Sequence, residues 1–436
     1  MAKTYESYKD SGIAWIGEIP SEWKMVDAKR ILKNEKKVVG KESENYDRLA
    51  LTLNGVIKRS KDDSEGLQPE KFESYQILGI NDLVFKLIDL QNISTSRVGL
   101  SPYEGLVSPA YIVVKNRKGN DNKFYYYWYM NMYYTHVFNN IGGDGVRSAI
   151  NAQDLLSLKI PNISLDKQRA IASFLDKKCG EIDSLISLQE EMISELQAYK
   201  QSVITEAVTK GLDPNAKMNC CASREKNDAC ISSSETQPAI ERKFKDSGVE
   251  WIGEIPEGWK TNRLKYLCSI ATGNKDTQDS EEDGIYKFYV RSPIIEHSNS
   301  WTFEGEGILM AGDGAGAGRV FHHAFGKYAV HQRVYRMADF KSINTNFLYY
   351  YLSSLFCRIM DMGSAQSTVP SVRLPMLTNF VVCIPPLSEQ QAIASYLDVK
   401  TSQIDSLITL KQQKIDELKS YKKSIIYEYV TGKKRV

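Results

Sequence analysis

Two stretches of the chain carry apolar residues at steps of three and four, with charged residues between them. The first covers residues 182–208 and the second 404–430, and neither contains Pro or Gly. This spacing predicts two long amphipathic helices. The apolar faces of the two helices are closely similar and can bury each other, so we predict an antiparallel coiled coil. The alternative is that each helix packs on its own domain. The expected seam positions are Ile182, Leu185, Leu196, Tyr199, Ile404, Leu407, Leu418 and Tyr421.

Each predicted helix follows a proline-containing strand exit and a polar start. Ile160-Pro-Asn-Ile-Ser164 precedes the first helix, and Ile384-Pro-Pro-Leu-Ser388 precedes the second. A serine followed by acidic or amide side chains is typical of a helix N-terminus. Gly211 and Gly432 mark the expected helix ends, since glycine is favoured just after the last turn.

Short apolar segments separated by turn residues predict antiparallel sheets in two other regions. They occur as parallel sets: 79–85 with 305–310, 97–99 with 319–321, and 106–114 with 328–335. An aromatic run follows each set, at 124–129 and at 347–352. Aromatic side chains can stack on bases, but one buried helical face explains these positions better, so we predict a helix packed on a sheet.

Two segments of the chain each occur twice with nearly the same sequence. Residues 8–24 return as 244–260, and residues 170–209 return as 392–431 with 23 identities in 40 aligned positions. The intervening regions, about 25–160 and 261–383, have diverged. A period this long excludes a solenoid and indicates an internal duplication with pseudo-two-fold symmetry. A shared frame with two unlike inserts predicts two modules that do parallel jobs on different targets.

Length and composition agree with two domains. The chain has 436 residues, of which 42% are apolar and 25% charged. We predict an α+β fold: two β-rich α/β domains separated by a pair of long antiparallel helices. The expected parts are a first domain at 1–160, a first helix at 161–211, a polar linker at 212–243, a second domain at 244–383, and a second helix at 384–436.

Other features narrow the class of protein. No apolar run approaches the roughly 18 residues that span a bilayer, and the start lacks a secretory leader, so we expect a cytoplasmic protein without membrane contact. Seven scattered cysteines without a Cys-x-x-Cys pair indicate neither a disulfide framework nor a metal site. A net charge of +2 argues against a strong stand-alone grip on DNA phosphates, but allows binding through local basic loops or with a partner.

The duplicated motifs resemble the DNA-specificity subunit of type I restriction-modification systems. The motifs are Lys-Asp-Ser-Gly-x-x-Trp-Ile-Gly-Glu-Ile-Pro-x-x-Trp, present twice, and Ile384-Pro-Pro-Leu-Ser-Glu-Gln-Gln391 ahead of a long helix. The resemblance covers the whole chain in order. One departure, Ser164-Leu-Asp-Lys-Gln168, concerns only the start of the first helix. Tryptophans 15, 23, 251 and 259 belong to the repeated frame, so we expect them to be apolar anchors rather than base contacts.

The resemblance implies a non-catalytic subunit. Each of two domains would read one half of a bipartite site in double-stranded DNA, and the coiled coil would set the spacer. It also implies two methylation subunits that hold S-adenosylmethionine, and restriction subunits that use ATP and Mg²⁺, with no cofactor on this chain. A free-standing duplicated DNA-binding regulator or scaffold is the alternative. The sequence contains no Asn-Pro-Pro-Tyr or Asp-Pro-Pro-Tyr element and no Gly-x-x-x-x-Gly-Lys-Ser/Thr loop, so catalysis is not expected.

Specific base contacts require Arg, Lys, Asn, Gln or hydroxyl side chains on exposed loops. The first choices lie in two loops that begin 18 to 21 residues before each Ile-Pro: Arg147 and Ser148 in the loop 142–148, Gln366 and Ser367 in the loop 363–368. Further candidates are Lys86, Arg97, Arg291, Asp313, Gly314, Arg319 and Arg333. The glycine-rich run 312–319 has the wrong spacing for a dinucleotide site; it predicts a DNA-facing loop, with a plain hairpin connection as the alternative.

The helices have the length of a spacer. Residues 182–208 are 27 residues, which at about 1.5 Å each span roughly 40 Å. One turn of B-DNA is about 34 Å. Two domains at opposite ends of such a pair would therefore reach half-sites about one turn apart.

Overall fold

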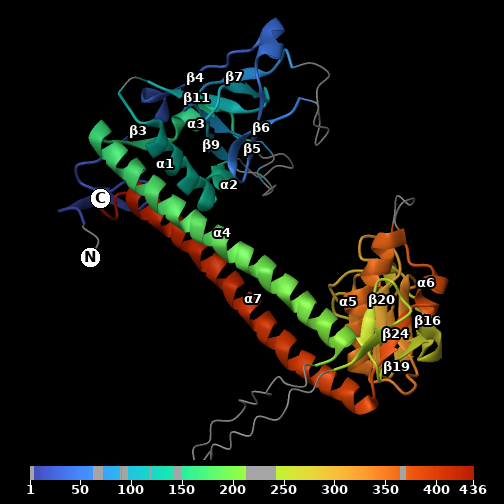
Figure 1. Cartoon of the computed structure of the whole chain (residues 1–436). Coiled ribbons are helices and arrows are strands. Elements are labelled where there is room, and N and C mark those ends of the chain that lie inside the picture. The colour runs from blue at the N-terminus through green and yellow to red at the C-terminus, as the bar shows by residue number, and fades with distance from the viewer. Residues whose placement is uncertain are drawn as a thin grey trace, which may run out of the picture. The chain divides into compact units, whose positions relative to one another are not determined.

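The computed structural model describes residues 4–61, 72–88, 90, 97–117, 119–141, 149–212, 242–363 and 370–436. The chain forms two compact units. The first contains Met1–Glu190 together with Lys411–Val436, and the second contains Glu191–Leu410. Both long helices therefore contribute one half to each unit. The two antiparallel helices and the mixed strands and helices around them confirm the predicted fold class (Figure 1).

The first unit contains two four-stranded sheets. One has the order β4-β11-β8-β9, formed by Leu32–Asn34, Ile112–Asn116, Leu83–Phe85 and Val98–Leu100. The other has the order β6-β5-β10-β7, formed by Gly55–Arg59, Arg48–Thr52, Gly105–Val107 and Gln76–Leu78. Strands β5 and β10 are parallel and the other pairs are antiparallel. Two small pairs, β1-β2 (Tyr8–Asp10, Glu18–Pro20) and β3-β12 (Lys24–Asp27, Lys159–Asn162), complete the strands.

The second unit repeats this plan. Its sheets have the orders β16-β23-β20-β21 (Ser269–Thr272, Val334–Ala338, Gly307–Ala311, Phe321–Ala324) and β18-β17-β22-β19 (Glu296–Ser298, Tyr286–Tyr289, Lys327–Val330, Phe303–Glu304). The small pairs are β13-β14 (Phe244–Asp246, Glu254–Pro256) and β15-β24 (Lys260–Arg263, Val381–Ile384). Strands β17 and β22 are again the parallel pair. The sequence had therefore located the equivalent strands of both copies correctly.

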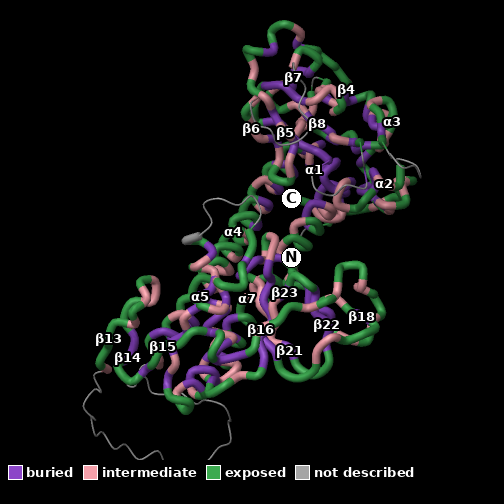
Figure 2. Tube along the Cα trace, turned by 90° about the vertical axis from the view of Figure 1, so that its right-hand side faces the viewer, coloured by how far each residue is buried: buried purple, intermediate pink, exposed green. Residues whose placement is uncertain are grey.

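An aromatic helix forms the centre of each unit. Helix α1 (Asn122–Tyr134) and helix α5 (Thr345–Gly363) bury their aromatic rings completely at Phe124, Trp128, Phe347 and Tyr351. Figure 2 shows the buried traces of these helices and of the strands beside them. The prediction of a buried helix rather than a stacking surface is thus confirmed. Short helices α2 (Val137–Ile141), α3 (Ala152–Ser157) and α6 (Leu374–Thr378) lie in the loops.

The long helices are α4 (Leu165–Lys210) and α7 (Leu387–Val430). In the first unit Lys422 Nζ binds Asp183 at 2.6 Å and Lys411 Nζ contacts Gln189 at 3.4 Å, so the helices run antiparallel. In the second unit the equivalent ion pair joins Lys200 and Asp405 at 2.7 Å. The two helices begin at equivalent positions, so the departure at residues 164–168 does not shift the helix start.

The predicted coiled-coil interface is only partly buried. Ile182 and Ile404 are buried, and Leu196 and Leu418 are half-buried. Leu185, Tyr199, Leu407 and Tyr421 are each about half exposed, which corrects their assignment to a buried coiled-coil interface. The outer turns of the helices belong to the domain cores instead, because a globular domain offers a wider apolar surface than one facing helix.

The duplicated tryptophans are anchors, as expected. Trp23 and Trp259 are fully buried, each in the core of its own unit. Trp15 packs on Trp128, and Trp251 stacks on Phe380. The residues of the predicted linker at 213–241 lie outside the described residues, and the chain returns at Arg242. In the described part of the chain, no helix is long and apolar enough to cross a membrane.

Candidate nucleic-acid interface

Both units attach their aromatic helix to a long helix through the same polar joint. The buried Gln168 of α4 accepts a hydrogen bond from the Asp121 backbone N–H at 2.7 Å and donates to the Ile163 carbonyl at 2.8 Å. Gln390 of α7 accepts from the Asn344 N–H at 2.7 Å and donates to the Pro385 carbonyl at 2.8 Å. One side chain thus fixes both the aromatic helix and the strand exit.

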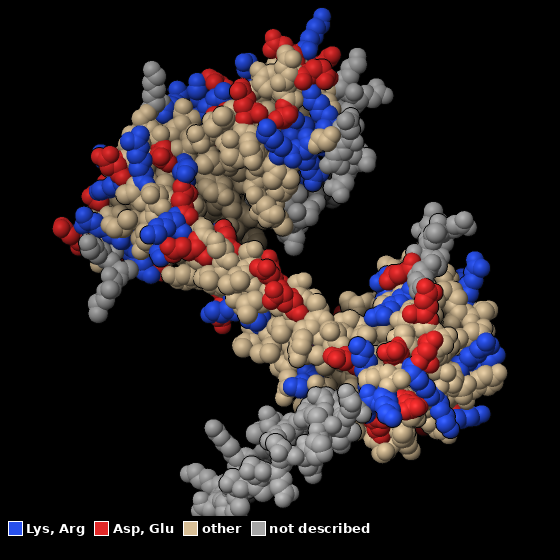
Figure 3. All heavy atoms as spheres, in the orientation of Figure 1, with Lys and Arg blue, Asp and Glu red and all other residues tan. Residues whose placement is uncertain are grey.

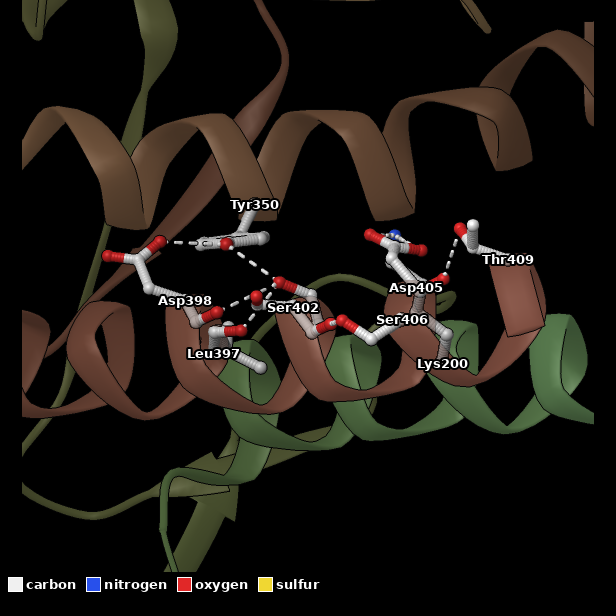
Figure 4. A network of polar contacts seen from close by, with 9 residues as sticks. Lys200, Tyr350, Leu397, Asp398, Ser402, Asp405, Ser406 and Thr409 are labelled. Atoms are coloured by element: carbon white, nitrogen blue, oxygen red, sulfur yellow. Dashed lines mark hydrogen bonds and ion pairs between the residues drawn. The ribbon is translucent and has the colours of Figure 1, made fainter. Parts of the chain in front are cut away.

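A tyrosine and an aspartate form the second part of this joint. Tyr127 donates to Asp176 at 2.8 Å in the first unit, and Tyr350 donates to Asp398 at 2.8 Å in the second (Figure 4). Burial raises the pKa of both phenols, and the neighbouring carboxylate raises it further. The hydroxyl groups therefore stay protonated at neutral pH and remain donors. These joints fix the domains to the helices.

In the second unit, a group of charged side chains gathers where β17, β20 and β22 end. Asp313 follows β20, Arg291 follows β17, and Arg333 precedes β23. Asp313 Oδ1 lies 3.0 Å from Arg291 Nη1, and Asp313 Oδ2 lies 3.7 Å from Arg333 Nε. The Asp313 side chain is 21% exposed, whereas that of Arg333 is 65% exposed. One largely buried carboxylate thus holds two outward-facing guanidinium groups.

Three neighbouring residues, which the sequence analysis did not select, support this group. His331 is buried, and its Nδ1 accepts the Arg333 backbone N–H at 3.0 Å. Asp276 lies 3.4 Å from His331 Nε2 and accepts from Gln332 Nε2 at 3.0 Å. Burial, aided by Arg291, lowers the pKa of His331 despite Asp276, so the ring is neutral at pH 7. The sequence did carry a signal for this group, because the polar triplet His-Gln-Arg interrupts an apolar run that otherwise resembles a strand. In the structure these three residues form the turn between β22 and β23.

The glycine-rich run is a hairpin connection between the antiparallel strands β20 and β21. Gly314 has φ +75°, and its N–H donates to the Pro370 carbonyl at 3.0 Å. At Gly318, φ is +65° and an added Cβ would lie 2.8 Å from Met360, so glycine is required there. The run is thus tied to the unit by its backbone. Arg319 at its end is exposed and paired with Asp361.

The candidates in the first unit fare differently. Arg97 is only 3% exposed and donates to the Ile88 carbonyl at 3.1 Å, so it cannot reach a base edge; its selection as a DNA contact was wrong. The sequence could not reveal the burial of Arg97, because a hydrogen bond to a backbone carbonyl requires no particular side chain at the accepting residue. Lys86 is half-buried, and its backbone N–H donates to the Arg97 carbonyl. Arg147, Ser148, Gln366 and Ser367 lie outside the described residues.

Equivalent hydrogen bonds align the two units residue by residue. The Ile150 N–H donates to the Leu87 carbonyl as Val372 donates to Gly312, which makes Ile88 the counterpart of Asp313. The Tyr111 N–H donates to the Ser108 carbonyl as Val334 donates to His331, which makes Ala110 the counterpart of Arg333. The first unit therefore has two apolar residues where the second has its carboxylate and an arginine.

A recess of about 470 Å³ occupies this place in the first unit. Ile88 and Ala110 line it, with Asn34, Lys36 and Asn151 among its polar residues. The face shown in Figure 3 carries Lys and Arg interspersed with Asp and Glu on each unit, in line with the small net charge. Among the described residues, no group of three or more His, Cys, Asp or Glu side chains could hold a metal ion.

Comparison with known proteins identifies the family. The model of the type I restriction-modification DNA specificity domain matches residues 20–198 and again 256–420, together most of the chain. The chain therefore belongs to this family and carries two recognition domains. It is 30% identical over 180 residues to the type I restriction enzyme EcoDI specificity subunit of Escherichia coli, covering 41% of this chain and 39% of that protein.

Two further relatives extend over nearly the whole chain. A protein of Methanocaldococcus jannaschii, provisionally named the type I restriction enzyme MjaX specificity subunit, is 25% identical over 97% of this chain and 96% of its own length. A chain solved in work on complex assembly and conformational transition of the type I R-M system superposes with a TM-score of 0.66 at 15% identity, covering 94% of this chain and 98% of the other. That similarity concerns the fold.

Proposed function

We propose that this chain gives a type I restriction-modification complex its sequence specificity. Each recognition domain reads one half of a bipartite target in double-stranded DNA. The observation that carries the proposal is a duplicated frame with two unlike surfaces: Asp313 and Arg333 in one domain stand where Ile88 and Ala110 stand in the other. Domains that bound the same half-site would have no reason to differ at this place while the joints around Gln168 and Gln390 stay alike.

The long helices act as the spacer in this proposal. Each is continuous from one unit to the other, without Pro or Gly over residues 182–208 and 404–430. Their 27-residue runs measure roughly 40 Å at 1.5 Å per residue, close to one turn of B-DNA. The separation of the half-sites would therefore follow the length of the helices.

Two methylation subunits are the proposed direct partners, with restriction subunits completing the complex. Each unit exposes the same three apolar side chains on its helices: Leu185, Leu188 and Tyr421 in the first, Leu407, Leu410 and Tyr199 in the second. Single exposed apolar residues are ordinary, but a set that recurs at equivalent positions suits one kind of partner bound twice. S-adenosylmethionine, ATP and Mg²⁺ would be held by the partners, and this chain would be non-catalytic.

The test is a map of methylated adenines in cells that carry or lack this gene, together with its methylation partner. We expect a two-part motif with a fixed spacer that is methylated only when this chain is present. Co-purification of the chain with the methylation subunit should accompany it. A chain that binds DNA alone and leaves the methylation pattern unchanged would instead be a free-standing regulator or scaffold, and would overturn the proposal.

A further inference from the structure

We infer that the second domain reads guanine through Arg333 and Arg291, and that Asp313 is the positioning residue that aims both guanidinium groups. The inference rests on the proposed function and specifies the base that this domain selects. Surface arginines are usually solvated and mobile, so exposure alone would not single out these two. The distinguishing feature is the shared carboxylate, which lies 3.0 Å from Arg291 and 3.7 Å from Arg333.

The donors that remain on Arg333 match the edge of guanine. Asp313 faces Nε of Arg333, and the other hydrogen bonds of Arg333 within the described part of the chain are made by its backbone, with His331 and with Gly312. Among the described residues, the two terminal nitrogens of Arg333 therefore have no partner, on a side chain that is 65% exposed. Two parallel N–H donors on a planar group pair with O6 and N7 of guanine in the major groove.

Hydrogen bonds hold both the N–H and the carbonyl of Arg333, which restricts where its guanidinium group can lie. Its N–H donates to Nδ1 of the buried His331 at 3.0 Å, and its carbonyl accepts from the Gly312 N–H at 2.8 Å. The ring of His331 in turn stacks on Phe288, with a centroid distance of 6.4 Å. Because this order exists before DNA arrives, less side-chain freedom is lost on binding.

A phosphate contact is the competing role for such arginines. Asp313 argues against it, because its negative charge lies beside both guanidinium groups and would repel a phosphate oxygen. The neutral O6 and N7 acceptors of guanine meet no such penalty. An arginine that only bound the backbone would also need no fixed orientation, since phosphate contacts carry no sequence information. The carboxylate thus favours a base contact over a phosphate contact.

The experiment is methylation mapping of the intact complex in cells that carry single variants. Arg333→Ala should raise methylation at sites with the wrong base at one guanine of the second half-site, so that discrimination there falls about ten- to a hundred-fold. Arg333→Lys, which retains charge but loses the paired donors, should relax the same position less. Asp313→Asn, which keeps size, should also relax guanine discrimination in the second half-site while the first half-site stays intact.

Arg263→Ala is the matched control, because Arg263 is an exposed arginine of the same unit on β15. It should leave the motif unchanged. An unchanged motif in Arg333→Ala, or a uniform loss of methylation at all sites, would overturn the inference, since uniform loss marks a phosphate contact. If Arg333→Ala does not fold, the same criteria apply to Arg333→Lys. A wild-type chain that directs no methylation at all would instead overturn the proposed function.

Discussion

The two recognition domains share one frame and differ at one surface. Their sheets have the same strand orders, their aromatic helices are buried alike, and Gln168 and Gln390 make the same pair of backbone hydrogen bonds. At the ends of the central strands, however, one domain has Asp313 and Arg333, whereas the other has Ile88 and Ala110. Folding constrains the frame, because buried polar side chains such as Gln168 and Gln390 must be paired. The exposed ends are free of that constraint.

The frame itself contains one instructive difference. The indole N–H of Trp259 donates to Glu389 at 3.0 Å, and Glu389 also pairs with Arg242, which caps the end of α4 through the Lys210 carbonyl. In the first domain Lys167 stands at the position of Glu389 and pairs with Glu22 instead, and among the described residues the buried indole N–H of Trp23 has no hydrogen-bond partner. Packing of the ring is therefore what both copies retain.

The largest expected effect comes from lengthening both helices at once. Four residues inserted after Leu188 and four after Leu410 would add about one turn, roughly 6 Å, at the boundary of the two units. We expect methylation of the native target to be lost and to reappear at sites whose spacer is one or two base pairs longer. The same insertion into the polar tract 213–241 is the control and should leave the spacer as it is. A native spacer in the helix insertion would remove the helices from the role of ruler.

The joints provide the next test, because they should be equivalent. Gln168→Leu and Gln390→Leu each leave a half-buried N–H and a buried carbonyl unpaired, which should cost about 1–3 kcal/mol in the free energy of unfolding of the unit concerned. Hydrogen exchange resolved along the chain would measure the two units separately. Gln403→Leu, on an exposed position of α7, should change little. Clearly unequal losses would show that the two joints are not alike.

Transfer of Asp313 and Arg333 to the first domain would test whether both domains face DNA with the same surface. Ile88→Asp combined with Ala110→Arg would place the chemistry of the second domain in the recess of the first. We expect base preference to change in the first half-site alone, by about ten-fold at one position. Methylation mapping would detect it. A motif that stays the same in both halves would mean that the first domain reads DNA elsewhere.

The smallest effect should come from the two equivalent ion pairs between the helices. Lys200 with Asp405 and Lys422 with Asp183 have side chains 23–56% exposed, so solvent screens them. Removing either pair should cost less than about 1 kcal/mol and the cost should shrink in high salt. Double-mutant cycles in low and high salt would measure both. A coupling of several kcal/mol in either pair would contradict this estimate of screening.

The sequence by itself determined the architecture of this protein. Apolar spacing located both long helices, the repeat located equivalent strands, and the duplicated motif identified the family. Helices and strands can be located in this way because they bury side chains at a fixed period along the chain. It also identified Arg291, Asp313 and Arg333 as candidates. Only the tertiary structure decided that Arg97 is buried against a carbonyl, that Leu185 and Tyr421 face outward, and that one carboxylate holds two arginines. Such facts depend on contacts between residues far apart in the chain, and local patterns carry no record of those contacts.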